Sequence, residues 1–253
     1  MPRNSRNKSS TGIYHVMLRG IDKRKIFLDN EDRYFFIEKM IEAKEKGGFD
    51  LYAYCLMDNH VHLLIKESEE LGTSVKRITV GYVGWHNNKY GRVGHLFQNR
   101  YASEVVEKDG YLLTVLRYIH QNPIKAGIVK DIEEYLWSSY KEYINYYSNK
   151  DYKIKADMIS GYFNCQKAFE DYMRQENTDK CIEYNENNKL TEVELKELML
   201  EKVDINKLKT LSKKERNSII KTIYTETEVS IRQLSKVLGL GKAIIESALR
   251  QDD

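Results

Sequence analysis

Two histidines separated by one residue are the strongest chemical signal in this sequence. His60 and His62 lie in the segment MDNHVHLLI, residues 57–65. This composition is typical of a strand, and side chains alternate between the faces of a strand, so both imidazoles should project from the same face. Neutral imidazole is a common ligand of divalent transition metals. On spacing alone, half of a metal site and a pair of structural histidines are equally good interpretations.

A tyrosine and an asparagine in the segment LRYIHQNP, residues 116–123, form a second candidate group. Residues four apart in a helix share one face, which places Tyr118 beside Asn122 and points His120 elsewhere. Tyr118 would then be a nucleophile and Asn122 a third, oxygen-donating metal ligand. The chain contains 19 tyrosines, and a tyrosine is more often a packing residue than a catalyst. The spacing therefore leaves both interpretations open.

The composition indicates a globular protein and argues against a membrane-spanning one. The 253-residue chain is 41% hydrophobic and 31% charged, with only 2 prolines, which is unlike a disordered or low-complexity chain. No apolar run approaches the roughly 18 residues that a membrane span needs, so we expect a soluble, cytoplasmic protein. The net charge of +3 permits a nucleic-acid partner without requiring one.

Three cysteines form no CxxC pair, and three further histidines have no partner at ligand spacing, so we predict structural roles for all six. They are Cys55, Cys165, Cys181, His15, His86 and His95.

The elements that must position the candidate residues follow the order β-α-β-β-α-β-α. Asp29 or Asn30 can cap the first helix, and Asp58 and Asn59 have the composition of a tight hairpin turn. This order predicts the α+β class, with a ferredoxin-like split-βαβ antiparallel sheet and helices on one face. The expected strands are residues 13–19, 51–56, 60–65 and an extended stretch within 96–106; the expected helices are 29–47, about 73–90 and about 111–123.

The chain divides into three predicted parts, which are residues 1–148, 149–190 and 191–253. The first would be the catalytic domain, the second an extension and linker, and the third a helical domain. Within the third, Ser230 can cap a helix and Gly239 permits a turn of positive φ, a spacing that fits a helix-turn-helix. An ordinary pair of antiparallel helices is the alternative.

Four ordered motifs together carry a resemblance to a known family. MDNHVHLLI is followed by YIHQNPIKAG and then by WSSY, residues 137–140, and the opening YHVMLRGIDKRKIFLDNEDRYFF spans residues 14–36. This pattern resembles the HUH single-tyrosine transposases of insertion-sequence type, and it is most similar to the REP-associated tyrosine transposases. The resemblance covers about residues 10–145. It departs at Asp58, where the family has Pro or Ser, and we expect the turn to tolerate this change.

The resemblance implies a metal-dependent DNA endonuclease and strand transferase. His60, His62 and Asn122 would hold a divalent ion, Mg²⁺ or Mn²⁺, with Gln121 as the alternative third ligand. Tyr118 would attack the scissile phosphate of single-stranded or hairpin DNA, leaving a 5′-phosphotyrosine and a free 3′-hydroxyl. Because both imidazoles must be neutral to bind metal, activity should fall below pH ~6.5.

DNA contacts are less well specified by the sequence. Each basic residue is as well explained by a solvated charge as by a phosphate contact, and Trp85 and Trp137 are expected in the core. The candidate DNA-binding residues are Arg19, Lys23, Arg24, Lys76, Arg77 and Arg100.

Two other functions compete with the transferase. The first is a DNA-binding regulator of the same fold that binds hairpin or duplex DNA without cleaving it. The second is a metal-dependent barrel hydrolase, which the order of elements argues against. The C-terminal region could bind duplex DNA through Lys242 and Arg250, or form a protein contact, and the chain could act as a monomer or a homodimer.

Overall fold

The computed structural model describes residues 7–98, 100–177, 181–182, 195–198, 208, 211–227 and 229–250. The chain forms two compact units, Met1–Glu183 and Tyr184–Asp253, which we describe separately. No helix in these described ranges is both long and apolar enough to cross a membrane.

A four-stranded antiparallel sheet is the centre of the N-terminal unit. Its strands are β1 (Ile13–Arg19), β2 (Asp50–Met57), β3 (His60–Lys66) and β4 (Ala102–Val105). They lie in the order β2-β3-β1-β4, and each neighbouring pair is antiparallel. The helices between them are α1 (Asn30–Gly47) and α2 (Leu71–Lys89), and α3 (Asp109–Lys125) follows β4. The predicted mixed α and β class is confirmed.

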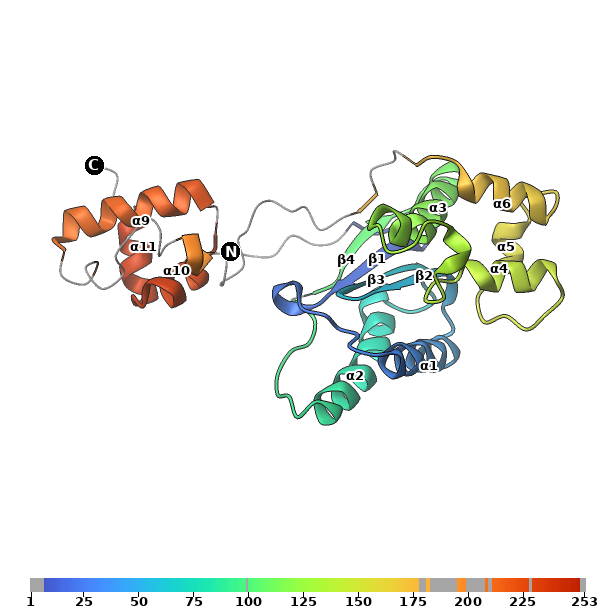
Figure 1. Cartoon of the computed structure of the whole chain (residues 1–253), viewed down its shortest axis with the longest axis horizontal. Coiled ribbons are helices and arrows are strands. Elements are labelled where there is room, and N and C mark those ends of the chain that lie inside the picture. The colour runs from blue at the N-terminus through green and yellow to red at the C-terminus, as the bar shows by residue number, and fades with distance from the viewer. Residues whose placement is uncertain are drawn as a thin grey trace. The chain divides into compact units, whose positions relative to one another are not determined.

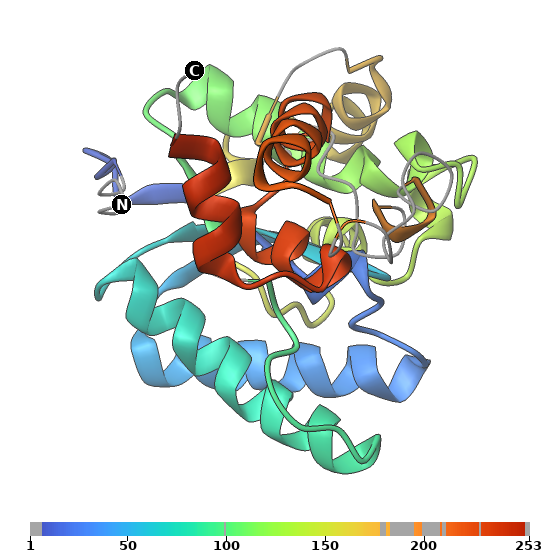
Figure 2. The same cartoon turned by 90° about the vertical axis from the view of Figure 1, so that its left-hand side faces the viewer.

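Helices cover both faces of this sheet, so the expectation of helices on one face was wrong. Figures 1 and 2 show α1 and α2 on one face and α3 on the opposite face. The residues of β3 show why, because Leu63, Leu64 and Ile65 are all fully buried although they point to alternate faces. A strand that is buried on both sides needs a covering layer on each side.

Asp58 and Asn59 form the turn of the β2–β3 hairpin, as predicted. The Asp58 carboxylate makes ion pairs with Lys25 and with Arg33. The backbone carbonyl oxygen of Asp58 accepts a hydrogen bond of 2.7 Å from the Ile26 amide. The residue that departs from the family pattern therefore fastens the hairpin turn to the loop after β1 and to α1.

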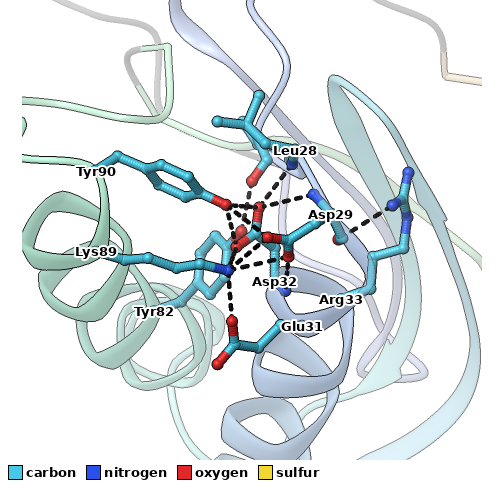
Figure 3. Close-up of polar contacts among 9 residues, drawn as sticks. Leu28, Asp29, Glu31, Asp32, Arg33, Tyr82, Lys89 and Tyr90 are labelled. Carbon is cyan, nitrogen blue, oxygen red and sulfur yellow. Dashed lines mark hydrogen bonds and ion pairs between the residues drawn. The ribbon is translucent and has the colours of Figure 1, made fainter.

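A cluster of charged side chains joins the start of α1 to the end of α2 (Figure 3). Asp29 caps α1 by accepting a hydrogen bond from the Asp32 amide. The Lys89 ammonium lies 2.8 Å from Asp29, 2.8 Å from Glu31 and 2.9 Å from Asp32. The Tyr90 hydroxyl also donates to Asp32 at 2.9 Å. Asp32 is fully buried, and these contacts provide the pairing that a buried charge needs.

The WSSY segment covers the outer edge of β2. The Leu56 amide donates to the Trp137 carbonyl at 2.9 Å, and the Ser139 amide donates to the Tyr54 carbonyl at 2.9 Å. Trp137 and Trp85 both pack as partly buried side chains against the core, as expected. The motif thus protects a sheet edge from unwanted pairing.

One short helix lies just before residue 148, and two more lie in the polar stretch that follows it. These are α4 (Tyr140–Tyr147), α5 (Ala156–Ser160) and α6 (Gln166–Arg174). Phe169 and Met173 of α6 are buried in the same core as the sheet. Part of the segment predicted as extension and linker therefore packs within the N-terminal unit, while the predicted domain boundaries stay a prediction.

Three helices make up most of the described residues of the C-terminal unit. They are α9 (Lys213–Thr227), α10 (Ile231–Leu238) and α11 (Lys242–Arg250). Ser230 caps α10 and forms a capping box with Gln233, and Gly239 ends this helix with a φ of 62°. The apolar positions Leu234 and Ile245 are fully buried. The cap, the turn and the packing lie where the sequence predicted them, and DNA binding by this helix pair stays a prediction.

Candidate active site

His60 and His62 project from one face of β3 toward α3. Their ring centroids are 5.0 Å apart. In the antiparallel pairing with β1, Arg19 lies opposite His60 and Met17 lies opposite His62. His62 is 1% exposed, and strand geometry fixes both rings with little freedom left to lose.

One nitrogen of each imidazole is already engaged by a protein group. Nδ1 of His60 lies 2.6 Å from Oδ1 of Asn59. Nδ1 of His62 lies 2.9 Å from Nε2 of His15. These bonds leave Nε2 of His60 and of His62 for a further partner. This donor set fits a divalent metal, because a metal-ligating histidine almost always uses its second nitrogen for a supporting hydrogen bond.

Tyr118 lies on α3 and packs against His62 and His15. Its ring centroid is 5.7 Å from that of His62 and 5.8 Å from that of His15, in edge-to-face geometry. The Lys125 ammonium lies 4.5 Å from the centre of the Tyr118 ring. The structure therefore brings Tyr118, the predicted nucleophile, beside His62, one of the predicted metal ligands, within a single chain. Only 2% of Tyr118 is exposed, so its ring is buried.

The two candidates for the third ligand have different partners. The side-chain nitrogen of Gln121, Nε2, donates to the backbone carbonyls of Met173 and Gln175, at 2.6 and 2.8 Å. Gln121 thus ties α3 to the end of α6. The Asn122 amide nitrogen donates to the Tyr118 carbonyl at 2.9 Å, a bond that does not use its side-chain oxygen. Neither residue uses its side-chain oxygen in these bonds, so the choice of Asn122 as the third ligand stays a prediction.

No group of three or more His, Cys, Asp or Glu side chains in the described ranges is arranged to hold a metal ion. The pair His60 and His62 would therefore need a donor of another type, and the amide oxygen of Asn122 is one.

The local environment keeps both candidate ligands neutral. Burial, together with the charge of Arg19, lowers the pKa of His60 to about 4. Burial and the neighbouring imidazoles of His15 and His60 lower the pKa of His62 well below its ordinary value of 6.5. The expectation that these rings protonate below pH ~6.5 is therefore wrong, because it assumed exposed imidazoles.

His15 is the site residue that sequence reasoning missed. It was expected to be structural because it has no partner at ligand spacing along the chain, yet it contacts both His62 and Tyr118. Its partner lies 47 residues away. The available signal was the antiparallel pairing of β1 with β3, which places His15 and His62 on the same face of the sheet.

The predicted DNA-binding residues lie in three segments of the chain. Arg19 lies opposite His60, and the Lys23 carbonyl accepts a hydrogen bond of 3.3 Å from the Asn59 side chain. Arg24 follows in the same loop and is exposed.

Lys76 and Arg77 lie on α2, on the sheet face opposite to α3 (Figure 1). Arg77 also makes an ion pair with Glu69 at 2.9 Å. The structure does not bring these two residues to the histidines. Arg100 is exposed in the segment before β4.

Comparison with known proteins shows a similarity to one family of transposases. Residues 8–122, which include all four strands and α3 as far as Asn122, match the model of a transposase family described as "Transposase IS200 like". This part of the chain is therefore similar to that transposase family.

The particular resemblance is to the REP-associated tyrosine transposases, and it is confirmed. A protein of Haemophilus influenzae that carries this name is 24% identical over 176 residues, which are 60% of this chain and 97% of the relative. A solved REP-associated tyrosine transposase bound to a REP hairpin is 17% identical with a TM-score of 0.49, covering 57% of this chain and 86% of that chain. A solved structure described as a transposase from Deinococcus radiodurans is 16% identical with a TM-score of 0.34, covering 47% and 97%.

Proposed function

We propose that this protein is a metal-dependent single-stranded DNA endonuclease and strand transferase with Tyr118 as its nucleophile. The observation that carries the proposal is the contact between the Tyr118 ring and His62, beside a second imidazole on the same strand. The substrate would be single-stranded or hairpin DNA, in transposition or at repeat hairpins. The similarity to REP-associated tyrosine transposases supports this choice.

The chemistry exchanges one phosphodiester for another. The phenolic oxygen of Tyr118 forms a bond to phosphorus while the bond from phosphorus to the 3′-oxygen breaks. The phenol loses a proton and the departing 3′-oxygen gains one, which leaves a 5′-phosphotyrosine and a free 3′-hydroxyl. Bond energy is retained, so a later 3′-hydroxyl can reverse the step.

His60, His62 and Asn122 are the residues that would hold the divalent ion. When bound, Mg²⁺ or Mn²⁺ supplies Lewis-acid polarisation of the phosphate oxygens. The protein's own contribution is to hold two neutral imidazoles in place and to keep the phenol beside them. Arg19, Lys23 and Arg24 lie at the same end of the sheet as His60 and would contact the DNA backbone.

The burial of Tyr118 places a condition on this mechanism. Since only 2% of the residue is exposed, the surroundings of α3 must open when a phosphate enters. The same observation favours a second candidate function, a DNA-binding regulator that keeps the fold without cleaving DNA.

A cleavage assay separates the two functions. Labelled hairpin oligonucleotides would be incubated with the protein and Mn²⁺, and the covalent adduct would be measured on a denaturing gel. Wild type and Tyr140→Phe should form the adduct, since Tyr140 is an equally buried tyrosine of the WSSY segment. Tyr118→Phe should form none while still binding Mn²⁺. An adduct that survives Tyr118→Phe rejects the nucleophile, and a mobility shift without cleavage by wild type supports the regulator.

We also infer that β1 to β4 with α1 and α2 form a ferredoxin-like split-βαβ unit. The order of elements and the strand order β2-β3-β1-β4 support this assignment.

The pair α10 and α11 is proposed as a helix-turn-helix that binds duplex DNA, with Lys242 and Arg250 exposed on α11. Replacing both with Ala should weaken duplex binding and reduce its salt dependence. Unchanged affinity would favour a protein contact instead.

A further inference from the structure

Three polar side chains form a row across the sheet, and the row ends at His62, a proposed metal ligand. Glu104 on β4 lies opposite His15 on β1 in the strand pairing, and Nε2 of His15 lies 2.9 Å from Nδ1 of His62 on β3. On the other side of His15, Nδ1 lies 3.8 Å from Oε2 of Glu104. His15 is fully buried, and Nδ1 has no hydrogen-bond partner among the described residues.

The contact between the two imidazoles permits two arrangements of one proton. In the first, Nδ1–H of His62 donates to Nε2 of His15, which leaves the lone pair of His62 Nε2 for a metal. In the second, Nε2–H of His15 donates to Nδ1 of His62, and the proton of neutral His62 must then sit on Nε2. Only the first arrangement can ligate, because a metal needs an unprotonated nitrogen.

The position of Glu104 selects between these arrangements. In the first, the remaining proton of His15 is on Nδ1 and points toward the carboxylate. In the second, Nδ1 carries a lone pair, and a lone pair facing a carboxylate is repelled. Glu104 is itself held in place, because its Oε2 accepts a hydrogen bond of 3.0 Å from the Ile182 amide.

We propose that His15 and Glu104 are positioning residues that fix the tautomer of His62 and present its Nε2 to a divalent cation. The inference rests on the proposed function for the role of His62, and it adds two residues that touch neither the DNA nor the reacting phosphate. A buried imidazole that served packing alone would not need a donor at one ring nitrogen and a carboxylate at the other.

The test compares four variants of the full chain. His15→Leu removes the acceptor, whereas His15→Gln keeps one, because an amide can accept from His62 with its oxygen and donate toward Glu104 with its nitrogen. Glu104→Leu removes the carboxylate. Glu107→Leu is the matched control, since Glu107 follows the same strand but hydrogen-bonds to Ser10 instead.

Two measurements are made on each variant, and neither requires catalysis. The first is the tautomer of His62 in metal-free protein, from ¹⁵N chemical shifts of the imidazole. The second is the dissociation constant for Mn²⁺ alone, from calorimetry. Wild type, His15→Gln and Glu107→Leu should show the Nδ1–H tautomer. His15→Leu and Glu104→Leu should lose this preference and bind Mn²⁺ about 10- to 100-fold more weakly.

An Nε2–H tautomer of His62 in wild type would overturn the inference. Unchanged Mn²⁺ affinity in folded His15→Leu would also overturn it. If His15→Leu does not fold, unchanged Mn²⁺ affinity in Glu104→Leu would overturn it instead. Failure of the proposed function looks different. In that case the tautomer and Mn²⁺ results hold, and hairpin DNA forms no adduct with wild type.

Discussion

Nε2 of His120, on α3, lies 2.8 Å from the hydroxyl oxygen of Ser139 in the WSSY segment. The same hydroxyl oxygen accepts a hydrogen bond of 2.9 Å from the Tyr54 amide on β2. Both His120 and Ser139 are fully buried. The helix that carries Tyr118 is therefore fastened to the edge strand through one serine, which physically connects the YIHQNPIKAG and WSSY motifs.

Ser139→Ala should destabilise the N-terminal unit by about 1–3 kcal/mol, because it leaves the Tyr54 amide and the His120 ring without their partner. The change would be measured by urea denaturation of the full chain. Ser148→Ala, at an exposed serine, should change the free energy of unfolding by less than about 0.5 kcal/mol. Equal effects from the two substitutions would contradict the proposed connection.

The lowered pKa of His60 makes a prediction about pH. The folded chain keeps this ring neutral down to about pH 4, whereas an unfolded chain binds the proton near pH 6.5. The unfolded state therefore binds more protons between these values, and the free energy of unfolding should decrease as the pH falls from 6.5 toward 4. We therefore expect His60 to remain neutral, and able to bind the proposed metal ion, at pH 6.

An NMR titration of the His60 ring in metal-free protein measures the shift directly. Arg19→Gln is the informative variant, since the Arg19 charge helps to lower the pKa of His60. The midpoint should rise in this variant. A wild-type midpoint near 6.5 would show that the ring is not in the environment described here.

Lys89→Met should be strongly destabilising. It leaves fully buried Asp32 without its cation, and breaking a buried ion pair in this way costs about 3–5 kcal/mol. The Lys89 side chain is 21% exposed, so we expect the lower end of this range. Thermal or urea unfolding provides the measurement.

Lys167→Met serves as the control for Lys89→Met, because Lys167 pairs with Asp171 on the surface of α6. Exposed pairs of this spacing contribute about 0.3–0.5 kcal/mol. If both lysine substitutions cost the same, the cluster at Asp32 does not join α1 to α2 as described.

Gly20 lies where no side chain fits, since a Cβ atom there would be 2.1 Å from the Arg24 carbonyl oxygen. The Gly20 amide also donates to the Asn59 carbonyl at 2.8 Å. Gly20→Ala should therefore displace the loop that carries Lys23 and Arg24, with a stability loss of about 1–3 kcal/mol and weaker binding to hairpin DNA.

Binding of a labelled hairpin and urea unfolding would be measured together for this variant. Gly84→Ala, inside α2 with no atom within 4 Å of the added Cβ, should instead stabilise the protein by about 0.5–1 kcal/mol. Unchanged hairpin affinity in Gly20→Ala would remove this loop from the proposed DNA contact.

Local features of the sequence determined much of the fold. The β2–β3 hairpin follows from Asp58 and Asn59 between two apolar runs, because turn chemistry acts over a few neighbouring residues. The start of α1 at Asp29 and the turn at Gly239 follow in the same way, from a capping carboxylate and from a residue that tolerates positive φ. The shared face of His60 and His62 needs only the alternation of a strand.

Other features were decided only by tertiary structure. The contact of His15 with His62 joins residues 47 positions apart, and the bonds from Gln121 to carbonyls near the end of α6 join residues 52 and 54 positions apart. The placement of α3 on the second face of the sheet followed from burial on both sides of β3. Spacing along the chain specifies which neighbours share a face, whereas the distance between separate elements depends on how their faces pack, and packing brings together residues that no local pattern links.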